Sequence, residues 1–250
     1  MNLDHAYGKN NIVGDIVELD DATLYYETYG TGQPLLLLHG NNQSISAFLN
    51  QVTEFSAHYK VIAVDTRGHG NSTDRTTGTL TYELFAADMV KLLDSLNLKK
   101  VNVLGWSDGG ITGLIMAMKY PEYINKLAVT GANLSPDSDA VKDIVRRDAQ
   151  ESIDELQGKT DKQSLVQKRI YELVLNEPHL AFEDLKQIKK PTLVMAGQND
   201  IILEDHTRQI AQNIPNSRLV IFRNASHFVP FYNAADFNQT VLEFFDSPDK

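Results

Sequence analysis

The stretch that decides the fold is VNVLGWSDGG, residues 101–110, in which a mostly apolar run leads into a Gly-x-Ser-x-Gly pattern centred on Ser107. A buried strand, this pattern and a helix-forming run in succession are the setting of a serine nucleophile on a tight strand-to-helix turn. Gly105 and Gly109 leave room for the strained turn and for close helix packing. The alternative is an ordinary serine that begins a helix. The context favours Ser107 as a nucleophile.

Short apolar runs like residues 101–104 recur along the chain, and such runs are typical of strands buried on both faces, as in a parallel sheet. They alternate with helical patterns at residues 81–96 and 110–120, which indicates helices on both faces of the sheet. Residues 15–19 and 23–29 flank an Asp-Asp turn, and we expect them to form an antiparallel hairpin. The other runs are at residues 34–38, 61–64, 127–129, 191–196 and 218–222. The sequence thus predicts an α/β fold with a mostly parallel, eight-stranded sheet.

One long segment, residues 133–186, interrupts this alternation, because it contains charged helical patterns and no convincing strand. We interpret it as a small helical cap inserted into a core domain of residues 1–132 and 187–250. The alternative is that these helices merely pack on the sheet. Tyr171 and Phe182 are expected to form the core of the cap, with the lining of a pocket as their alternative role.

A serine hydroxyl is a weak nucleophile until a base takes its proton, so a partner histidine is expected. His227 is the candidate, since it follows the last apolar strand, and loops at the carboxyl ends of parallel strands converge on one site. His39 also ends a strand, but its His-Gly sequence indicates a role in shaping the oxyanion loop. His69, in a Gly-rich loop, is the second histidine to test. The others are expected to be mostly solvated: His5, His58, His179 and His206.

The imidazole must be held in one tautomer, usually by a buried carboxylate. Asp200 is the candidate acid, because it follows an apolar run at the end of a strand. The order Ser107, Asp200, His227 is the order expected when a serine nucleophile sits on a strand-to-helix turn of this kind. Asp137 and Asp139, after the preceding strand, are weaker rivals.

An oxyanion requires two N–H donors aimed at the developing charge. We expect them to be the backbone N–H groups of Asp108 and of Asn41, the latter in the loop after residues 34–38. The Asp108 carboxylate would repel an oxyanion unless it points toward the acyl portion of the substrate, where it could pair with an ammonium group. Capping the helix or meeting the 133–186 segment is the equally weighted alternative. Trp106 is a further candidate substrate contact, although burial beside the turn is the favoured expectation.

Several motifs together resemble the α/β-hydrolase superfamily over nearly the whole chain outside the 133–186 segment. They are HG at 39–40, DTRGHGNS at 65–72, the serine turn, GQND at 197–200 and SH at 226–227. A narrower similarity, to the biphenyl-hydrolase-like (valacyclovir hydrolase) branch, rests on GWSDGGIT at 105–112, KYPEYI at 119–124 and GAN at 131–133. The resemblance implies the α/β-hydrolase fold, and the narrower one implies esters of α-amino acids. The cap has no such match, so the resemblance determines the fold better than the substrate.

The chemistry predicted is that of a serine hydrolase that cleaves small carboxylic esters through an acyl-enzyme intermediate, without cofactor or metal. Esters of α-amino acids are the narrower hypothesis. Serine at position 107 argues against dehalogenases and epoxide hydrolases of this fold, which use aspartate there. Carbon–carbon bond hydrolases and aminopeptidases keep the serine, and some proteins of the fold bind a ligand without turnover, so all three remain alternatives.

Composition excludes several other classes. The 250 residues carry 33 acidic and 23 basic side chains, a net charge of -10, which argues against a nucleic-acid partner. The absence of cysteine excludes disulfides, thiolate metal sites and cysteine nucleophiles. No apolar run approaches the roughly 18 residues of a spanning helix, and residues 1–5 do not resemble a secretory signal. We expect a cytoplasmic monomer or homodimer whose partner is a small-molecule ester.

Overall fold

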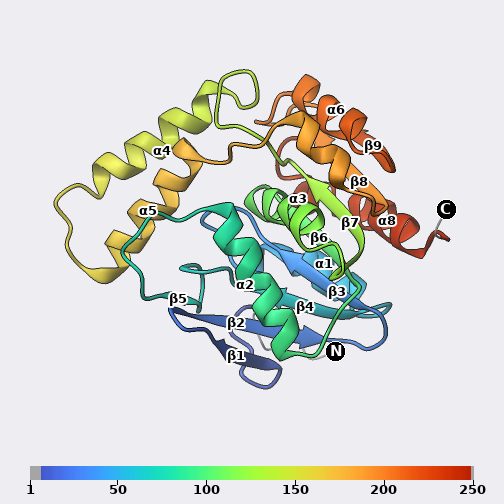
Figure 1. Cartoon of the computed structure of the whole chain (residues 1–250), viewed down its shortest axis with the longest axis horizontal. Coiled ribbons are helices and arrows are strands. Elements are labelled where there is room, and N and C mark those ends of the chain that lie inside the picture. The colour runs from blue at the N-terminus through green and yellow to red at the C-terminus, as the bar shows by residue number, and fades with distance from the viewer. Residues whose placement is uncertain (1–6, 249–250) are drawn as a thin grey trace.

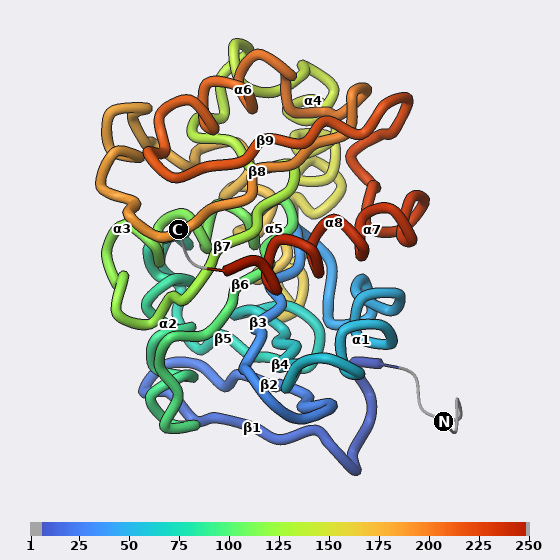
Figure 2. The backbone as a smooth tube through the Cα atoms, turned by 90° about the vertical axis from the view of Figure 1, so that its right-hand side faces the viewer, coloured from blue at the N-terminus to red at the C-terminus, as the bar shows by residue number. Residues whose placement is uncertain are grey.

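The computed structural model describes residues 7–248, and in this range nine strands form a single sheet (Figure 1). Eight of the strands lie side by side in the order β1-β2-β4-β3-β6-β7-β8-β9, a succession that Figure 2 shows from β1 at the bottom to β9 at the top. The ninth, β5, pairs with β2. The strands are β1 Gly14–Glu18, β2 Ala22–Tyr29, β3 Pro34–Leu38, β4 Lys60–Val64, β5 Thr73–Asp74, β6 Val101–Trp106, β7 Ile124–Thr130, β8 Thr192–Gly197 and β9 Ser217–Phe222. The predicted fold class is confirmed, and β5 was missed because two residues carry no periodicity.

The sheet is antiparallel at its β1 end and parallel from β4 to β9. The expected hairpin is confirmed, with Asp15 paired to Tyr26. The β3 strand shows why the parallel strands are wholly apolar: Leu36 and Leu38 pack in the hydrophobic cluster on one face, whereas Leu35 and Leu37 pack in the cluster on the other. Each of these four fully buried side chains contributes roughly 1.5–3 kcal/mol of hydrophobic free energy.

Helices cover both faces of the sheet (Figure 1). Side chains of α2, α3 and α6 fill one hydrophobic cluster, and side chains of α1, α7 and α8 fill the other. The first predicted helix begins as its sequence indicates, because the Thr81 side chain accepts a hydrogen bond from the N–H of Leu84. The elements outside the 133–186 segment are η1 Ile45–Phe48, α1 Leu49–Phe55, α2 Tyr82–Ser95, α3 Asp108–Lys119, α6 Glu204–Asn213, α7 Val229–Tyr232 and α8 Ala234–Asp246.

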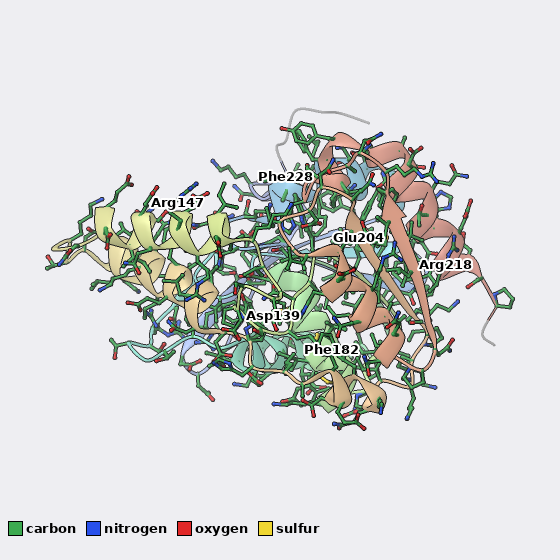
Figure 3. The ribbon with its side chains drawn as sticks, turned by 90° about the horizontal axis from the view of Figure 1, so that it is seen from above. Asp139, Arg147, Phe182, Glu204, Arg218 and Phe228 are labelled. Carbon is green, nitrogen blue, oxygen red and sulfur yellow. The ribbon has the colours of Figure 1, made fainter. Side chains whose placement is uncertain are left out.

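The segment between β7 and β8 holds α4 Asp143–Glu155, α5 Lys162–Asn176 and η2 Phe182–Gln187, and within the described chain it adds no strand to the sheet. Helices α4 and α5 pack on each other and extend to one side of the core (Figures 1 and 3). An isolated bridge between Val141 and Ile202 ties the start of the segment to the core. The division into a core and a cap at residues 133 and 186 stays a prediction.

A buried network of charges holds α5 against the core. Arg67, whose side chain is fully buried, pairs with Asp88 at 2.7 Å and with Asp74 at 3.1 Å. Arg169 of α5 reaches the same Asp74, with 2.6 Å between Nη2 and Oδ2. Each buried charge therefore has a partner, as stability in a low-dielectric interior requires.

Within residues 7–248, no helix has both the length and the apolar character needed to cross a membrane. Residues 1–6 and 249–250 lie outside the described range, and with them the expectations about a secretory signal and about His5.

Candidate active site

Ser107 occupies a strained turn between β6 and α3, with φ of 56° and ψ of -117°. A non-glycine residue rarely adopts a positive φ, and such strain is concentrated at functional sites. Both flanking positions must be glycine, because the surrounding backbone leaves no room for a Cβ atom. A Cβ at Gly105 would lie 2.2 Å from the carbonyl oxygen of Gly109, and a Cβ at Gly109 would lie 2.0 Å from that of Leu38. Helix α3 therefore packs directly against the strands, with Ser107 at its N-terminus.

Asp200 and His227 form the closest carboxylate–imidazole contact in the neighbourhood of this turn. The His227 Nδ1 lies 2.6 Å from the Asp200 Oδ1, and both side chains are buried. The same oxygen accepts from the N–H of Ile202 at 3.0 Å, which fixes the carboxylate. Because an ionised carboxylate only accepts, Nδ1 of the ring carries the proton and Nε2 is left as the acceptor. This tautomer is the one a general base needs.

The backbone around His227 holds the imidazole in place. Gly131, which follows β7 with φ of +63°, packs so closely that a Cβ there would lie 2.7 Å from the His227 Cε1. The Trp106 Nε1 donates to the His227 carbonyl oxygen at 3.1 Å. Trp106 is buried in the hydrophobic cluster that α1, α7 and α8 fill. This agrees with the favoured expectation, burial beside the turn, and not with the candidate role of Trp106 as a substrate contact.

His39 shapes the loop after β3, as its sequence suggested. Its Nε2 accepts a hydrogen bond from the N–H of Thr66 at 3.0 Å, so Nδ1 carries the proton and donates to the Gly40 carbonyl oxygen at 2.8 Å. Full burial lowers the pKa of His39 to about 3, and the ring stays neutral. Gly40 must be small, since a Cβ there would lie 3.0 Å from the Ser107 Cβ. The loop thus brings the Asn41 backbone to the side of the nucleophile.

Asn41 and Asp108 make direct contact beside Ser107. The Asn41 Nδ2 donates to the Asp108 Oδ2 at 2.9 Å and to the Ile170 carbonyl oxygen of α5 at 3.1 Å. Burial raises the pKa of Asp108, while hydrogen bonds from Asn41 and Tyr82 oppose that rise. Among the described residues, no other residue accepts a hydrogen bond from the backbone N–H of Asn41 or Asp108. The N–H of Asp108 also helps to lower the pKa of its own carboxylate. The role of the two N–H groups as oxyanion donors stays a prediction.

The rival residues lie elsewhere. His69 lines a neighbouring cavity of about 600 Å³, beneath α5, and its Nδ1 is engaged with the Arg67 carbonyl oxygen. Asp137 bonds to Ser135 in its own turn. His206, which we expected to be solvated, is instead buried and accepts from the N–H of Leu134 at 3.1 Å. The polar sequence of α6 concealed this inward-facing position.

Ser107, His227, Asn41 and Asp108 share one cavity of about 400 Å³ between the core and helices α4 and α5. This volume lies within the roughly 300–1,000 Å³ of small-molecule sites. Among the described residues, those lining the cavity include three carboxylates, Asp108, Asp148 and Glu177, and no lysine or arginine. The cavity therefore favours a cation.

The 133–186 segment contributes residues that sequence reasoning ranked low or missed. Tyr171 lines the cavity, contrary to its expected place in the cap core, whereas Phe182 packs on His206 with ring centres 5.1 Å apart. Glu177 was missed, because a glutamate before a proline at a helix end has no signal that separates a pocket residue from a solvated one. Figure 3 shows Arg147 on helix α4, to one side of the core, and Phe228, the residue after His227, on the core itself.

Comparison with known proteins identifies the family. Residues 33–152 match the family model described as alpha/beta hydrolase fold. The serine hydrolase BPHL of Mus musculus is 30% identical over an alignment that covers 91% of this chain and 84% of that protein. The 2-hydroxy-6-oxononadienedioate/2-hydroxy-6-oxononatrienedioate hydrolase of Burkholderia vietnamiensis is 28% identical, with 94% and 93% covered.

Comparison with solved structures gives the same fold. The crystal structure of a hydrolase from Pseudomonas aeruginosa superposes with a TM-score of 0.80 at 22% identity, and covers 95% of this chain and 100% of that one. At this identity the likeness concerns the fold alone, and it agrees with the sheet order and with the sequence resemblance. The chain therefore belongs to the α/β-hydrolase family, as a hydrolase related to the BPHL serine hydrolases.

Proposed function

We propose that this protein is a serine hydrolase of small carboxylic esters, with a preference for esters of α-amino acids. The observation that carries the proposal is the 2.6 Å contact of Asp200 with His227, which lines the same cavity as Ser107 on its strained turn. Nucleophile, base and orienting acid on the ends of separate strands are the arrangement of acyl-transfer chemistry.

The reaction follows from the positions of these groups. The Ser107 Oγ attacks the ester carbonyl carbon while its proton passes to the His227 Nε2, and the N–H groups of Asn41 and Asp108 hold the oxyanion. The carbon–oxygen bond to the alcohol then breaks, and His227 returns the proton to the leaving oxygen. Water, deprotonated by the same imidazole, attacks the acyl-enzyme and releases the acid and the free Ser107 hydroxyl. Asp200 stabilises the imidazolium in both halves.

The preference for an amino-acyl group rests on Asp108. Its carboxylate is buried in the cavity wall, where the Asn41 amide holds one oxygen. An ammonium group is the ligand that such a carboxylate recognises best, since the cavity offers no lysine or arginine among its described residues. The negative charge then lies on the acyl side of the substrate, away from the oxyanion.

Carbon–carbon bond hydrolysis and aminopeptidase activity remain alternative reactions of the same triad. The relative from Burkholderia vietnamiensis is named for dioates, which carry two carboxylates. The carboxylates of Asp108 and Glu177 in the wall of this cavity would repel such a dianion. The acidic lining therefore favours a cationic ester or amide over a dioate.

The first test measures hydrolysis of p-nitrophenyl and amino-acyl esters by the wild type and by Ser107→Ala. We expect the variant to lose about a thousandfold or more in kcat/KM, because no other group replaces the nucleophile. Ser152→Ala is the matched control, since Ser152 lines the same cavity from α4 and, in the part of the chain that the structure describes, its hydroxyl bonds only to its own helix. Equal rates for Ser107→Ala and wild type would overturn the esterase proposal, and tight ligand binding without turnover would indicate a receptor.

The second test isolates the acyl preference through Asp108→Asn, which keeps the shape and removes the charge. We expect kcat/KM to fall at least tenfold more for an amino-acyl ester than for a neutral ester of similar size. Equal losses on both esters would assign Asp108 a structural role only.

A further inference from the structure

Glu177 places a second carboxylate in the wall of the active-site cavity, on the side of the 133–186 segment. It is the residue after helix α5, its N–H bonds to the Leu173 carbonyl oxygen, and its half-buried side chain lines the cavity. Among the described residues, its carboxylate has no hydrogen bond or ion pair. A partly desolvated carboxylate without a partner is unfavourable until a ligand supplies one.

Glu177 and Asp108 occupy separate places in the cavity. Burial raises the pKa of Tyr82, a phenol that lines the same cavity, and the charges of Asp108 and Glu177 raise it further. Burial and the charge of Glu83 raise the pKa of Glu177, and His179 lowers it. Asp108 lies at the start of α3 and Glu177 directly follows α5, so the two carboxylates line the cavity from different elements.

The surroundings of Glu177 strengthen its attraction for a cation. It sits at the carboxyl end of a helix of 15 residues, where the helix dipole adds partial negative charge. The cavity contains no described lysine or arginine that could neutralise it. Asp148, the third carboxylate, differs, because it is exposed and lies 3.2 Å from the Arg147 guanidinium.

We propose that Glu177 selects acyl groups that carry a second cation, the side-chain ammonium of a dibasic amino acid of the lysine or ornithine type. In this arrangement the α-ammonium pairs with Asp108 and the side-chain ammonium extends across the cavity to Glu177. The inference rests on the proposed function, since it names the substrate class of that same site.

The experiment compares the ethyl esters of L-lysine and L-norleucine, which share the α-ammonium and the carbon chain and differ in the terminal ammonium. We expect the wild type to favour the lysine ester about tenfold in kcat/KM, as a charge-assisted hydrogen bond supplies. Glu177→Gln should bring this ratio close to one by slowing the lysine ester alone. Glu172→Gln, which removes an exposed carboxylate paired with Lys168 on the same helix, should keep the wild-type ratio.

A binding measurement separates this inference from the esterase proposal. Calorimetry on Ser107→Ala with L-lysinamide and L-norleucinamide should show the same preference, and its loss when Glu177→Gln is added. Ser107-dependent hydrolysis with a ratio near one in the wild type, or a ratio unchanged by Glu177→Gln, would overturn the role of Glu177 and leave the esterase intact. Selective lysinamide binding without hydrolysis of any ester would support Glu177 and overturn the esterase.

Discussion

The cavity has two walls that differ in construction. The core wall carries Ser107 directly after the buried strand β6 and His227 in the loop after the edge strand β9, and close packing fixes His227 at Gly131. The opposite wall consists of α4 and α5, where Ile144 is 44% exposed although it lines the cavity. Reacting groups need sub-ångström placement, and a rigid scaffold provides it. Groups that recognise the substrate tolerate more variation, so they can stand on helices with fewer ties to the core.

Several specific contacts tie these helices to the core. Arg169 pairs with the buried Asp74, the Ile170 carbonyl oxygen accepts from the Asn41 side chain, and Val141 bridges to Ile202. The Asn41 contact is notable because the same amide also holds the Asp108 carboxylate. Movement of α5 would therefore change the acyl side of the nucleophile before it changed the position of His227.

The largest effect should come from the core wall, at Asp200. Asp200→Asn keeps the volume but stabilises the wrong tautomer of His227, and we expect kcat to fall about 10³–10⁴-fold. The measurement is ester hydrolysis, and the control is Asp205→Asn, which changes an exposed aspartate of α6. Retained activity in Asp200→Asn together with a loss in Asp139→Asn would reassign the acid to the rival residue.

Two glycines with positive φ, one in each wall region, make a matched pair. Gly131→Ala adds a methyl group 2.7 Å from the His227 ring, and we expect activity to fall about tenfold to a hundredfold as the imidazole is displaced. Gly158 lies between α4 and α5, with φ of +79° and open space around it. Gly158→Ala should therefore cost about 1 kcal/mol of stability from backbone strain and leave kcat unchanged. Similar activity losses in both would remove the distinction between the walls.

Two buried histidines of the core, His39 and His69, should make stability depend on pH. Burial lowers the pKa of His39 to about 3 and that of His69 to about 4, below the value near 6.5 of an unfolded histidine. Below pH 6.5 the unfolded chain binds these protons and the folded chain does not. The free energy of unfolding should therefore fall by about 1.4 kcal/mol per pH unit for each histidine as the pH drops from about 6 toward 4.

Urea unfolding at several pH values measures this slope. His69→Gln should reduce it by about one proton, whereas His179→Gln, at an exposed position of the 133–186 segment, should leave it unchanged. An identical slope in all three proteins would show that other groups dominate the acid sensitivity.

The smallest expected effect concerns the attachment of the cap. Arg169→Met removes the ion pair with Asp74, which keeps Arg67 as a partner, so we expect a stability loss of about 1–2 kcal/mol. KM should rise several-fold while kcat changes little, because α5 carries cavity residues and no member of the triad. Lys168→Met, which removes only an exposed pair on the same helix, is the control. A fall in kcat with unchanged KM would show that α5 also positions the reacting groups.

Much of this architecture could be predicted from the sequence. Wholly apolar strands, the hairpin and the elbow at Ser107 are local patterns, and each reflects burial on two faces or a required backbone angle. The order of Ser107, Asp200 and His227 placed the candidate triad at strand ends, and the structure brings Asp200 and His227 into contact. These features could be predicted because a parallel sheet converts local patterns into a common edge.

Other features depended on tertiary contacts between distant segments. Three features follow from how α4, α5 and α6 pack on the core: the inward position of His206, the place of Tyr171 in the cavity wall, and the Glu177 carboxylate, which has no partner within residues 7–248. Polar helices have similar sequence patterns whether one side faces solvent or a cavity. The sequence by itself therefore determined the family fold and predicted the candidate reacting groups. Only the tertiary structure decided which charges line the cavity, because that depends on the packing of α4 and α5.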